Sequence, residues 1–153
     1  MADPGSTIPS DDLEGATGGP TGAEMARAWF EQSPFARQLG LELIELQPDR
    51  AEVRLPYTPS IATAGDVVHG GAISSLIDTA AALAAWSSHD PAQGSRWGTV
   101  SMTVNFEAAA TGEDLLARAD ITRRGKGLCF VAIGVEAAGG RTVAHALVTY
   151  RLG

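Results

Sequence analysis

The sequence predicts an α+β fold in which an antiparallel sheet wraps around one long central helix. We expect a helix over residues 70–86, because this segment is rich in alanine, lacks proline and is apolar nearly all round, as in a helix that is buried on most sides. Strand-like segments separated by short glycine-containing turns close the chain, and consecutive strands joined in this way pair antiparallel. A helix and a sheet that both have apolar surface to bury pack on one another as layers.

The chain of 153 residues fits one domain with a sizeable core. Residues 1–22 are rich in Gly, Pro, Ser, Thr and Asp, and they have almost nothing apolar to bury. We therefore expect a disordered N-terminal tail over 1–22 and a single folded domain over 23–153.

Short elements are expected between the tail and the long helix. The segment 23–32 has apolar residues at helical spacing, and Ser33 and Pro34 are expected to end this helix. Strands are expected near 41–47 and 51–56, with a Gln-Pro-Asp turn between them. Apolar and charged residues alternate in the second of these strands, which indicates one buried face.

The closing strands are expected near 97–107, 114–124, 128–137 and 141–152. In the first of them apolar and polar residues alternate. Val100 and Met102 are therefore expected on one face of the sheet, with Thr99 and Ser101 on the other. This alternation predicts a strand that buries one face only.

Composition and charge exclude several classes of partner. The net charge of -7 argues against broad nucleic-acid binding, which needs a basic surface. No apolar run reaches the ~18 residues of a membrane span, and the N-terminus has no basic patch followed by an apolar stretch. We therefore expect a cytoplasmic protein with neither a nucleic-acid nor a membrane partner. Cys129 is expected to be a buried structural thiol, and no metal is expected because the cysteine and histidines lack metal-ligand spacing.

Asp78 is the anomaly of the long helix, because it is charged and lies among residues typical of a core. A buried carboxylate is costly unless it meets a hydrogen-bonding partner, solvent or a ligand. At roughly 100° per residue, the large aliphatic residues form one stripe, and small residues surround Asp78. The stripe consists of Ile73, Leu76, Ile77, Ala80, Leu83 and Ala84, and the small neighbours are Ser74, Ser75, Ala81, Ala82 and Ala85. The Asp78 face therefore has room for a partner helix or a thin ligand, although a structural role in which Asp78 bonds another subunit or local hydroxyls stays open.

The head of the same helix, His69-Gly70-Gly71, favours a functional interpretation of Asp78. Glycines at a helix start expose backbone N–H groups to close approach, and the helix dipole adds partial positive charge there. Such a site can hold the oxyanion that develops in acyl transfer. Two glycines can equally mark a tight turn, and His69 can be a loop residue that bonds the backbone, so these alternatives stay open.

Gly70 and Asp78 are eight residues apart on one helix, or roughly 12 Å along its axis. One carboxylate side chain cannot span that distance. The two groups can meet on one substrate only if they come from different chains, as in an isologous dimer whose helices lie side by side and antiparallel. If both groups are catalytic, the sequence predicts a site at a subunit interface.

Two segments resemble a known family. VVHGGAISSLIDTAAALAAW and TVSMTVNFEAAATGEDLLARADITRRGKGLCFVAIGVEAAGGRTVAHALVTYRL are similar to the PaaI-like branch of the hotdog-fold acyl-CoA thioesterases. The resemblance covers residues 35–152 and includes His-Gly-Gly, an acidic residue nine positions after that His, and the closing pattern G-R-x-V-A-x-A-x-x-T-Y. It implies hydrolysis of an acyl-CoA without a cofactor. The separation of Gly70 and Asp78 leads us to expect a homodimer at least, and the resemblance is compatible with a homotetramer.

The resemblance also implies roles for individual residues. Gly70 corresponds to the glycine that supplies the oxyanion N–H, and His69 to the histidine that orients the loop. Asp78 corresponds to the acidic residue that activates water or attacks the thioester directly. Thr99, three residues before Met102, corresponds to a Ser or Thr that helps to orient the water.

The substrate-binding residues are less well matched to the family pattern. Thr63 stands where many relatives have an Asn or Gln that binds the thioester or the water, and Gly65 is displaced by one position from the family glycine. Thr63 and Gly71 are nevertheless expected to contact the substrate. The resemblance places CoA contacts near the turn that carries a basic cluster, whose members are Arg123, Arg124 and Lys126. Phosphates of CoA favour such a cluster, and a solvated turn is the alternative.

The leading hypothesis is therefore acyl-CoA hydrolysis with Asp78 as general base or nucleophile and the Gly70 N–H as oxyanion donor. No G-x-S-x-G motif is present, which argues against a serine hydrolase. The alternative is a non-catalytic module that binds or senses acyl-CoA on the same fold, and Thr63 is the residue that favours it. A hydratase has no matching motif here, and a purely structural oligomer gives no reason to bury Asp78.

Overall fold

The computed structural model describes residues 19–94 and 96–152, so most of the tail expected over 1–22 lies outside the described residues. Helix α1 (Gly22–Gln32) confirms the predicted first helix. Thr21 caps it, because its side-chain oxygen accepts a hydrogen bond from the Glu24 N–H at 3.2 Å while the Glu24 carboxylate accepts one from the Thr21 N–H at 2.7 Å. This reciprocal capping box satisfies two donors that a helix start otherwise leaves unpaired.

A second short helix, α2 (Pro34–Leu39), follows α1 without a loop and was absent from the prediction. Ser33 and Pro34 end α1 as expected, but they also begin α2. The Ser33 side chain accepts a hydrogen bond from the Ala36 N–H at 3.3 Å, and proline suits the first helical position because its missing N–H needs no partner there. Gly40, in the left-handed region at φ 67°, ends α2.

The main sheet is antiparallel throughout and has six strands in the order β1-β2-β6-β7-β8-β5. Its strands are β1 (Glu42–Gln47), β2 (Arg50–Leu55), β5 (Trp97–Phe106), β6 (Leu115–Arg124), β7 (Leu128–Glu136) and β8 (Thr142–Leu152). A small ribbon of β3 (Ala62–Ala64) and β4 (Val67–Val68) leads into the long helix α3 (Gly70–Ser87). All the predicted strands are confirmed to within one or two residues. β1 and β5 are the two open edges of the sheet.

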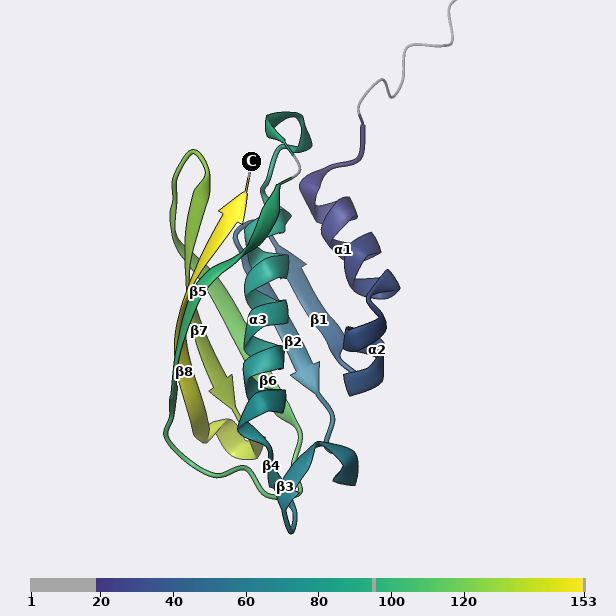
Figure 1. Ribbon diagram of the computed structural model, residues 1–153, viewed down its shortest axis with the longest axis vertical. Helices are drawn as coiled ribbons and strands as arrows, with labels where there is room; N and C mark the ends of the chain where they lie inside the picture. Colours follow the sequence, from purple (N-terminus) through teal and green to yellow (C-terminus); the bar gives the residue numbers. More distant parts are fainter. Residues whose placement is uncertain (1–18, 95, 153) are drawn as a thin grey trace, which may run out of the picture.

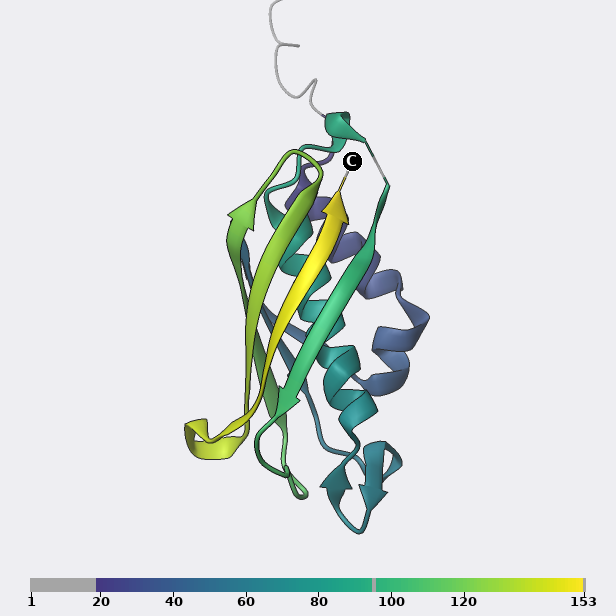
Figure 2. The same ribbon diagram turned by 60° about the vertical axis from the view of Figure 1, so that its left-hand side comes forward.

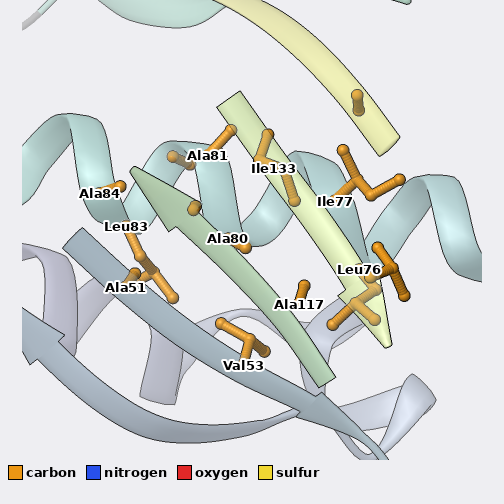
Figure 3. Packing of buried hydrophobic residues seen from close by; sticks show 14 of the residues in the cluster. Ala51, Val53, Leu76, Ile77, Ala80, Ala81, Leu83, Ala84, Ala117 and Ile133 are labelled. Carbon is orange, nitrogen blue, oxygen red and sulfur yellow. The ribbon is translucent and has the colours of Figure 1, made fainter. Parts of the chain in front are cut away.

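The sheet curls around α3, while α1 lies along the flank of α3 that faces away from β5 (Figures 1 and 2). The predicted aliphatic stripe of α3 is fully buried against the sheet, where it meets small and branched side chains of β2, β6 and β7 (Figure 3). Burial of each large aliphatic side chain contributes roughly 1.5–3 kcal/mol. The stripe includes Leu76, Ile77 and Leu83, and their partners include Val53, Ala117 and Ile133.

No helix in the described part of the chain is both long and apolar enough to cross a membrane.

The predicted alternation of β5 is wrong at its start, because the strand contains a β-bulge. Thr99 pairs with Tyr150 and Ser101 pairs with Thr149, so Val100 has no partner of its own on β8. The extra residue turns Thr99 to the same face as Met102, towards α3, and leaves Val100 59% exposed. A one-residue irregularity reverses the face of every residue on one side of it.

Candidate active site

Asp78 lies in the middle of α3 and is exposed in the single chain, which corrects the expectation that it is buried. Of the small residues around it, Ser74 and Ser75 are half-buried, whereas Ala81, Ala82 and Ala85 are buried. The cost of burying a charge therefore does not apply within one chain. What remains is a carboxylate that stands on an open surface flanked by small side chains.

The bulge of β5 gives Asp78 a hydrogen-bonding partner. The Thr99 hydroxyl donates to one carboxylate oxygen, Oδ1, of Asp78, with 2.5 Å between the oxygen atoms. A donor fixed to Oδ1 orients the carboxylate and leaves Oδ2 facing away from that bond. The structure thus brings together the two residues that the resemblance pairs, although Thr99 bonds Asp78 itself in this arrangement.

Tyr150 lies beneath this pair and was not among the predicted site residues. It is the partner of Thr99 across the β5–β8 ladder, and it is only 2% exposed. Burial raises the pKa of Tyr150 to about 12, and the negative charge of Asp78 raises it further, while a hydrogen bond with Trp86 opposes the shift. The phenol therefore stays neutral beside the carboxylate. The sequence signal was the Thr-Tyr of the closing pattern, but only the strand register places Tyr150 opposite Thr99.

The shifted pKa of Tyr150 predicts alkaline destabilisation. A folded-state pKa of about 12, against an ordinary value of 10.0, means that the folded chain holds this proton more tightly than the unfolded chain. The stabilisation is fully present below pH 10 and is lost as the pH rises towards 12, by roughly 3 kcal/mol in all. Urea unfolding at pH 9, 10.5 and 12 is expected to give a falling free energy whose pH slope is smaller in Tyr150→Phe. An equal slope in both proteins would contradict the assignment.

His69 caps α3 and shapes its first turn. Its backbone is extended at φ -65° and ψ 134°, and its Nδ1 accepts a hydrogen bond from the Gly71 N–H at 2.7 Å. A Cβ on Gly71 would lie 2.8 Å from Nδ1, so glycine is required for this close approach. The Gly71 N–H is consequently not available to a substrate while this cap is in place. The capping role for His69 was one of the open alternatives, and it accounts for the second glycine of the motif.

The Gly70 N–H remains available at the positive end of α3. It belongs to the first helical residue, and it has no hydrogen-bond acceptor among the residues that the structure describes. Gly70 and Thr63 line one hollow of about 370 Å³ together with Phe106, so the structure brings the predicted oxyanion donor and the residue at the family Asn or Gln position together. Gly65, in the left-handed region at φ 54°, lies in the turn of the adjoining ribbon.

Gly70 and Asp78 lie against opposite ends of the same edge strand. A Cβ on Gly70 would lie 3.4 Å from the ring of Phe106, at the end of β5, whereas Asp78 bonds Thr99 near its start. Both residues belong to α3, where eight residues separate them by about 12 Å. The structure therefore does not bring these two predicted catalytic groups together within one chain.

The three residues of the basic cluster differ in their contacts. The Arg124 guanidinium is held inside the fold by Asp49 at 2.6 Å and by the Ala85 carbonyl at 3.0 Å, and it also contacts the Cys129 sulphur. It joins the end of α3 to the sheet, and it is not free to bind phosphate while these bonds persist. Arg123 and Lys126 are exposed, and neither forms an ion pair within residues 19–94 and 96–152.

The other histidines and the cysteine lie elsewhere. His89 Nε2 lies 2.9 Å from the Gly94 carbonyl in the loop after α3, and His145 Nδ1 lies 2.6 Å from a Glu107 oxygen on an exposed strand face. Cys129 is buried, and burial raises the pKa of its thiol. Within the described ranges no three His, Cys, Asp or Glu side chains are grouped in a way that could hold a metal ion.

The sequence profile of the thioesterase superfamily matches residues 65–144, a span that includes the head of α3, Asp78 and Thr99. The chain belongs to the thioesterase superfamily. Its six-stranded antiparallel sheet around a long helix is the hotdog fold of this superfamily.

Two relatives of similar sequence have names that indicate ester or thioester hydrolysis. The medium/long-chain acyl-CoA thioesterase YigI of Escherichia coli K12 is 27% identical over 133 residues, which span 78% of this chain and 86% of YigI. A Mycobacterium tuberculosis protein named as a candidate esterase is 39% identical over 54 residues, and that match spans only 35% of this chain and 39% of the relative.

Solved structures extend the similarity over most of the chain. A thioesterase family protein from Silicibacter pomeroyi superposes with a TM-score of 0.79 and 28% identity, covering 85% of this chain and 96% of that one. The E. coli PaaI protein from the phenylacetic acid degradation operon gives a TM-score of 0.75 and 26% identity, covering 86% and 94% respectively.

Proposed function

We propose that this protein hydrolyses an acyl-CoA thioester to the free acid and CoA, with Asp78 and Gly70 from different subunits acting on one substrate. The observation that carries the proposal is the placement of an exposed carboxylate and a free helix N-terminal N–H at opposite ends of one open edge strand, β5. The superfamily membership and the similarity to YigI support the reaction class. No cofactor is needed for hydrolysis.

The edge of β5 supplies a way to complete the site. An edge strand presents unpaired N–H and C=O groups, and it pairs readily with another strand. Phe106, at the end of β5, is 53% exposed, although a large apolar side chain favours burial. Antiparallel pairing of the regular part, 101–106, with the same segment of a second copy continues the sheet across a two-fold axis.

That pairing joins the two halves of the site. The end of β5 in one copy, which adjoins Gly70, comes to lie beside the start of β5 in the other copy, where Thr99 holds Asp78. The two α3 helices then lie side by side and antiparallel, with their small-residue faces in contact. Two identical sites result, and each takes its carboxylate from one copy and its oxyanion donor from the partner.

The chemistry follows from these positions. Asp78, oriented by Thr99, removes a proton from a water molecule as the water oxygen attacks the thioester carbon. The carbonyl electrons move to oxygen, where the Gly70 N–H and the α3 dipole stabilise the developing charge. Collapse of the tetrahedral intermediate breaks the C–S bond, and the proton held by Asp78 passes to the departing sulphur. In the alternative route the carboxylate attacks the carbon itself, the C–S bond breaks and CoA leaves as the thiolate. Water then hydrolyses the resulting anhydride to the free acid and the Asp78 carboxylate, and a proton from this water neutralises the thiolate.

A non-catalytic acyl-CoA binding module is the second candidate, and Thr63 is the residue that favours it. A threonine hydroxyl is shorter than an Asn or Gln carboxamide, so the hollow beside Gly70 offers one fewer polar group in reach of a substrate. Such a module would share the fold and the subunit interface, but it would release no thiol.

Thiol release from a panel of aryl-, short-chain and medium-chain CoA esters separates the two candidates. The enzyme proposal expects turnover of at least one ester, with the rate proportional to protein concentration. Tight binding of acyl-CoA with no thiol released across the panel would overturn it in favour of the binding module.

A further inference from the structure

Helix α2 presents an apolar face that is incompletely covered, beside the first half of α3 (Figures 1 and 2). Phe35 is 54% exposed, and Leu39, one turn further along the same face of α2, is half-buried. Ala36 of the same helix is buried, and its carbonyl accepts a hydrogen bond from the Leu41 N–H at 2.9 Å. The helix is therefore anchored, and its uncovered apolar face is suited to an apolar ligand.

A hollow of about 220 Å³ lies between α2 and the head of α3. On the side away from α2 it is bounded by the short 3₁₀ turn Pro59–Ile61 and by the start of β3. The Ile61 carbonyl accepts a hydrogen bond from the His69 N–H at 2.8 Å, so this side is fixed to the head of α3. The apolar wall of the hollow consists of Phe35, Leu39, Ile61, Ala62 and Ala72.

The polar side chains that line the hollow between α2 and α3 are already engaged with the protein. The Ser75 hydroxyl donates a hydrogen bond to the Gly71 carbonyl at 2.8 Å, and the Ser60 and Thr58 hydroxyls bond one another at 2.8 Å. His69 Nδ1 accepts the Gly71 N–H. A polar group that entered the hollow would lose its hydration without gaining a serine proton in return, so the hollow favours an apolar group.

The position of this hollow relative to Gly70 suits an acyl group. Gly71 lines the hollow, and its Cα lies about 3.8 Å from that of Gly70, the proposed oxyanion donor. Gly70 itself lines the other hollow, beside β5, which also contains Thr63 and the Glu107 carboxylate. A thioester carbonyl held at the Gly70 N–H carries an acyl group and a sulphur arm that point away from one another. Of the two hollows, the one between α2 and α3 has no carboxylate in its lining and fits the apolar acyl group better.

The volume of the hollow sets the size of the group that it can hold. A protein cavity of roughly 150 Å³ lined by aliphatic and aromatic side chains accepts benzene, which has six carbons. By the same ratio, a hollow of about 220 Å³ accommodates roughly eight or nine carbons. Phe35 is the largest side chain of the apolar wall, so this residue restricts the volume more than any other member of the wall.

We propose that the hollow between α2 and α3 binds the acyl group of the substrate, and that Phe35 limits this group to an apolar chain of about eight carbons. This inference rests on the proposed function and deepens it, because it names the substrate class. Gly71 then contacts the acyl chain through its Cα, which needs no free N–H. The subunit that supplies Gly70 also supplies the acyl hollow, while the second copy supplies Asp78.

The test measures kcat/KM for straight-chain esters from butanoyl-CoA to hexadecanoyl-CoA. In the wild type, kcat/KM is expected to rise about fourfold per added methylene, at ~0.8 kcal/mol per buried CH₂, as far as octanoyl-CoA and no further. Phe35→Ala enlarges the hollow and is expected to extend the rise towards dodecanoyl-CoA. Ala62→Leu fills part of the hollow and is expected to end the rise near hexanoyl-CoA. Phe130→Ala, at a phenylalanine of β7 that is 41% exposed and does not line the hollow, is the matched control and should keep the wild-type profile.

Three results would overturn the acyl hollow while leaving the proposed hydrolysis intact. These are the wild-type chain-length profile in both variants, an equal loss of rate at every chain length, or turnover of aryl esters alone. Calorimetric binding of the same acyl-CoA series keeps the two proposals apart. If the wild type releases no thiol but binds more tightly with each methylene up to octanoyl-CoA, and Phe35→Ala extends that trend, the proposed function fails and the acyl hollow stands.

Discussion

Replacement of Asp78 by asparagine is expected to lower thiol release from the best acyl-CoA by about 10²- to 10⁴-fold, the usual contribution of a positioned general base. Asparagine has nearly the same shape as aspartate, and its amide oxygen can still accept the Thr99 hydroxyl bond. It cannot take a proton from water or form an anhydride. Because Asp78 is exposed in the single chain, its substitution leaves no unpaired buried charge, and the fold should persist.

Ser74→Ala is the matched control for Asp78→Asn. Ser74 lies one turn before Asp78 on the same face of α3, and it is half-buried. Its hydroxyl has no assigned part in the chemistry, so the control should retain near wild-type kcat. Unfolding curves and oligomeric state should match in all three proteins. A purely structural role for Asp78 predicts the reverse pattern, with a loss of stability and a proportionate, modest loss of activity.

Replacement of Gly70 by proline is expected to lower kcat by about 10²- to 10³-fold relative to Gly70→Ala, because proline removes the N–H that would bind the oxyanion. The position suits this substitution. Gly70 is the first residue of α3, where proline is tolerated, and the preceding His69 already has the extended backbone that a following proline requires.

The alanine variant isolates the N–H from the added bulk. Alanine and proline both introduce a Cβ, which would lie 3.4 Å from the Phe106 ring, but only alanine keeps the donor. Equal activity in Gly70→Ala and Gly70→Pro would mean that some other group holds the oxyanion. Thermal unfolding of both variants shows whether the helix start is retained.

Much of this fold could be predicted from the sequence, because the local residue patterns and the tertiary packing favour the same elements. The apolar, proline-free segment at 70–86 could only be a buried helix, and the glycines of the closing turns fixed the hairpins. Helix α2 was missed because Ser33-Pro34 carries two signals, a stop for one helix and a start for the next. A six-residue helix offers too short a pattern to distinguish the second signal.

The site was partly predictable. Residue types and spacing were sufficient to select Asp78 and the head of α3, but not to determine their surroundings. The bulge at Val100, which turns Thr99 towards Asp78, depends on pairing with a strand about fifty residues away. In the sequence Arg124 could not be distinguished from the other basic residues of its turn. Its bonds with Asp49 and the Ala85 carbonyl depend on tertiary packing. Asp78 was expected to be buried because a helix pattern does not show where a single chain leaves its own surface uncovered.

The claim that each site takes groups from two subunits is tested most directly by mixing two inactive variants. Asp78→Asn and Gly70→Pro chains are unfolded together in equal amounts and refolded, so that half of the dimers contain one chain of each kind. In a mixed dimer, one site has both defects and the other has neither, and the mixture is expected to recover about one quarter of wild-type activity. Activity no higher than the mean of the two separate variants, at a dimer composition verified by mass, would contradict a site shared between subunits.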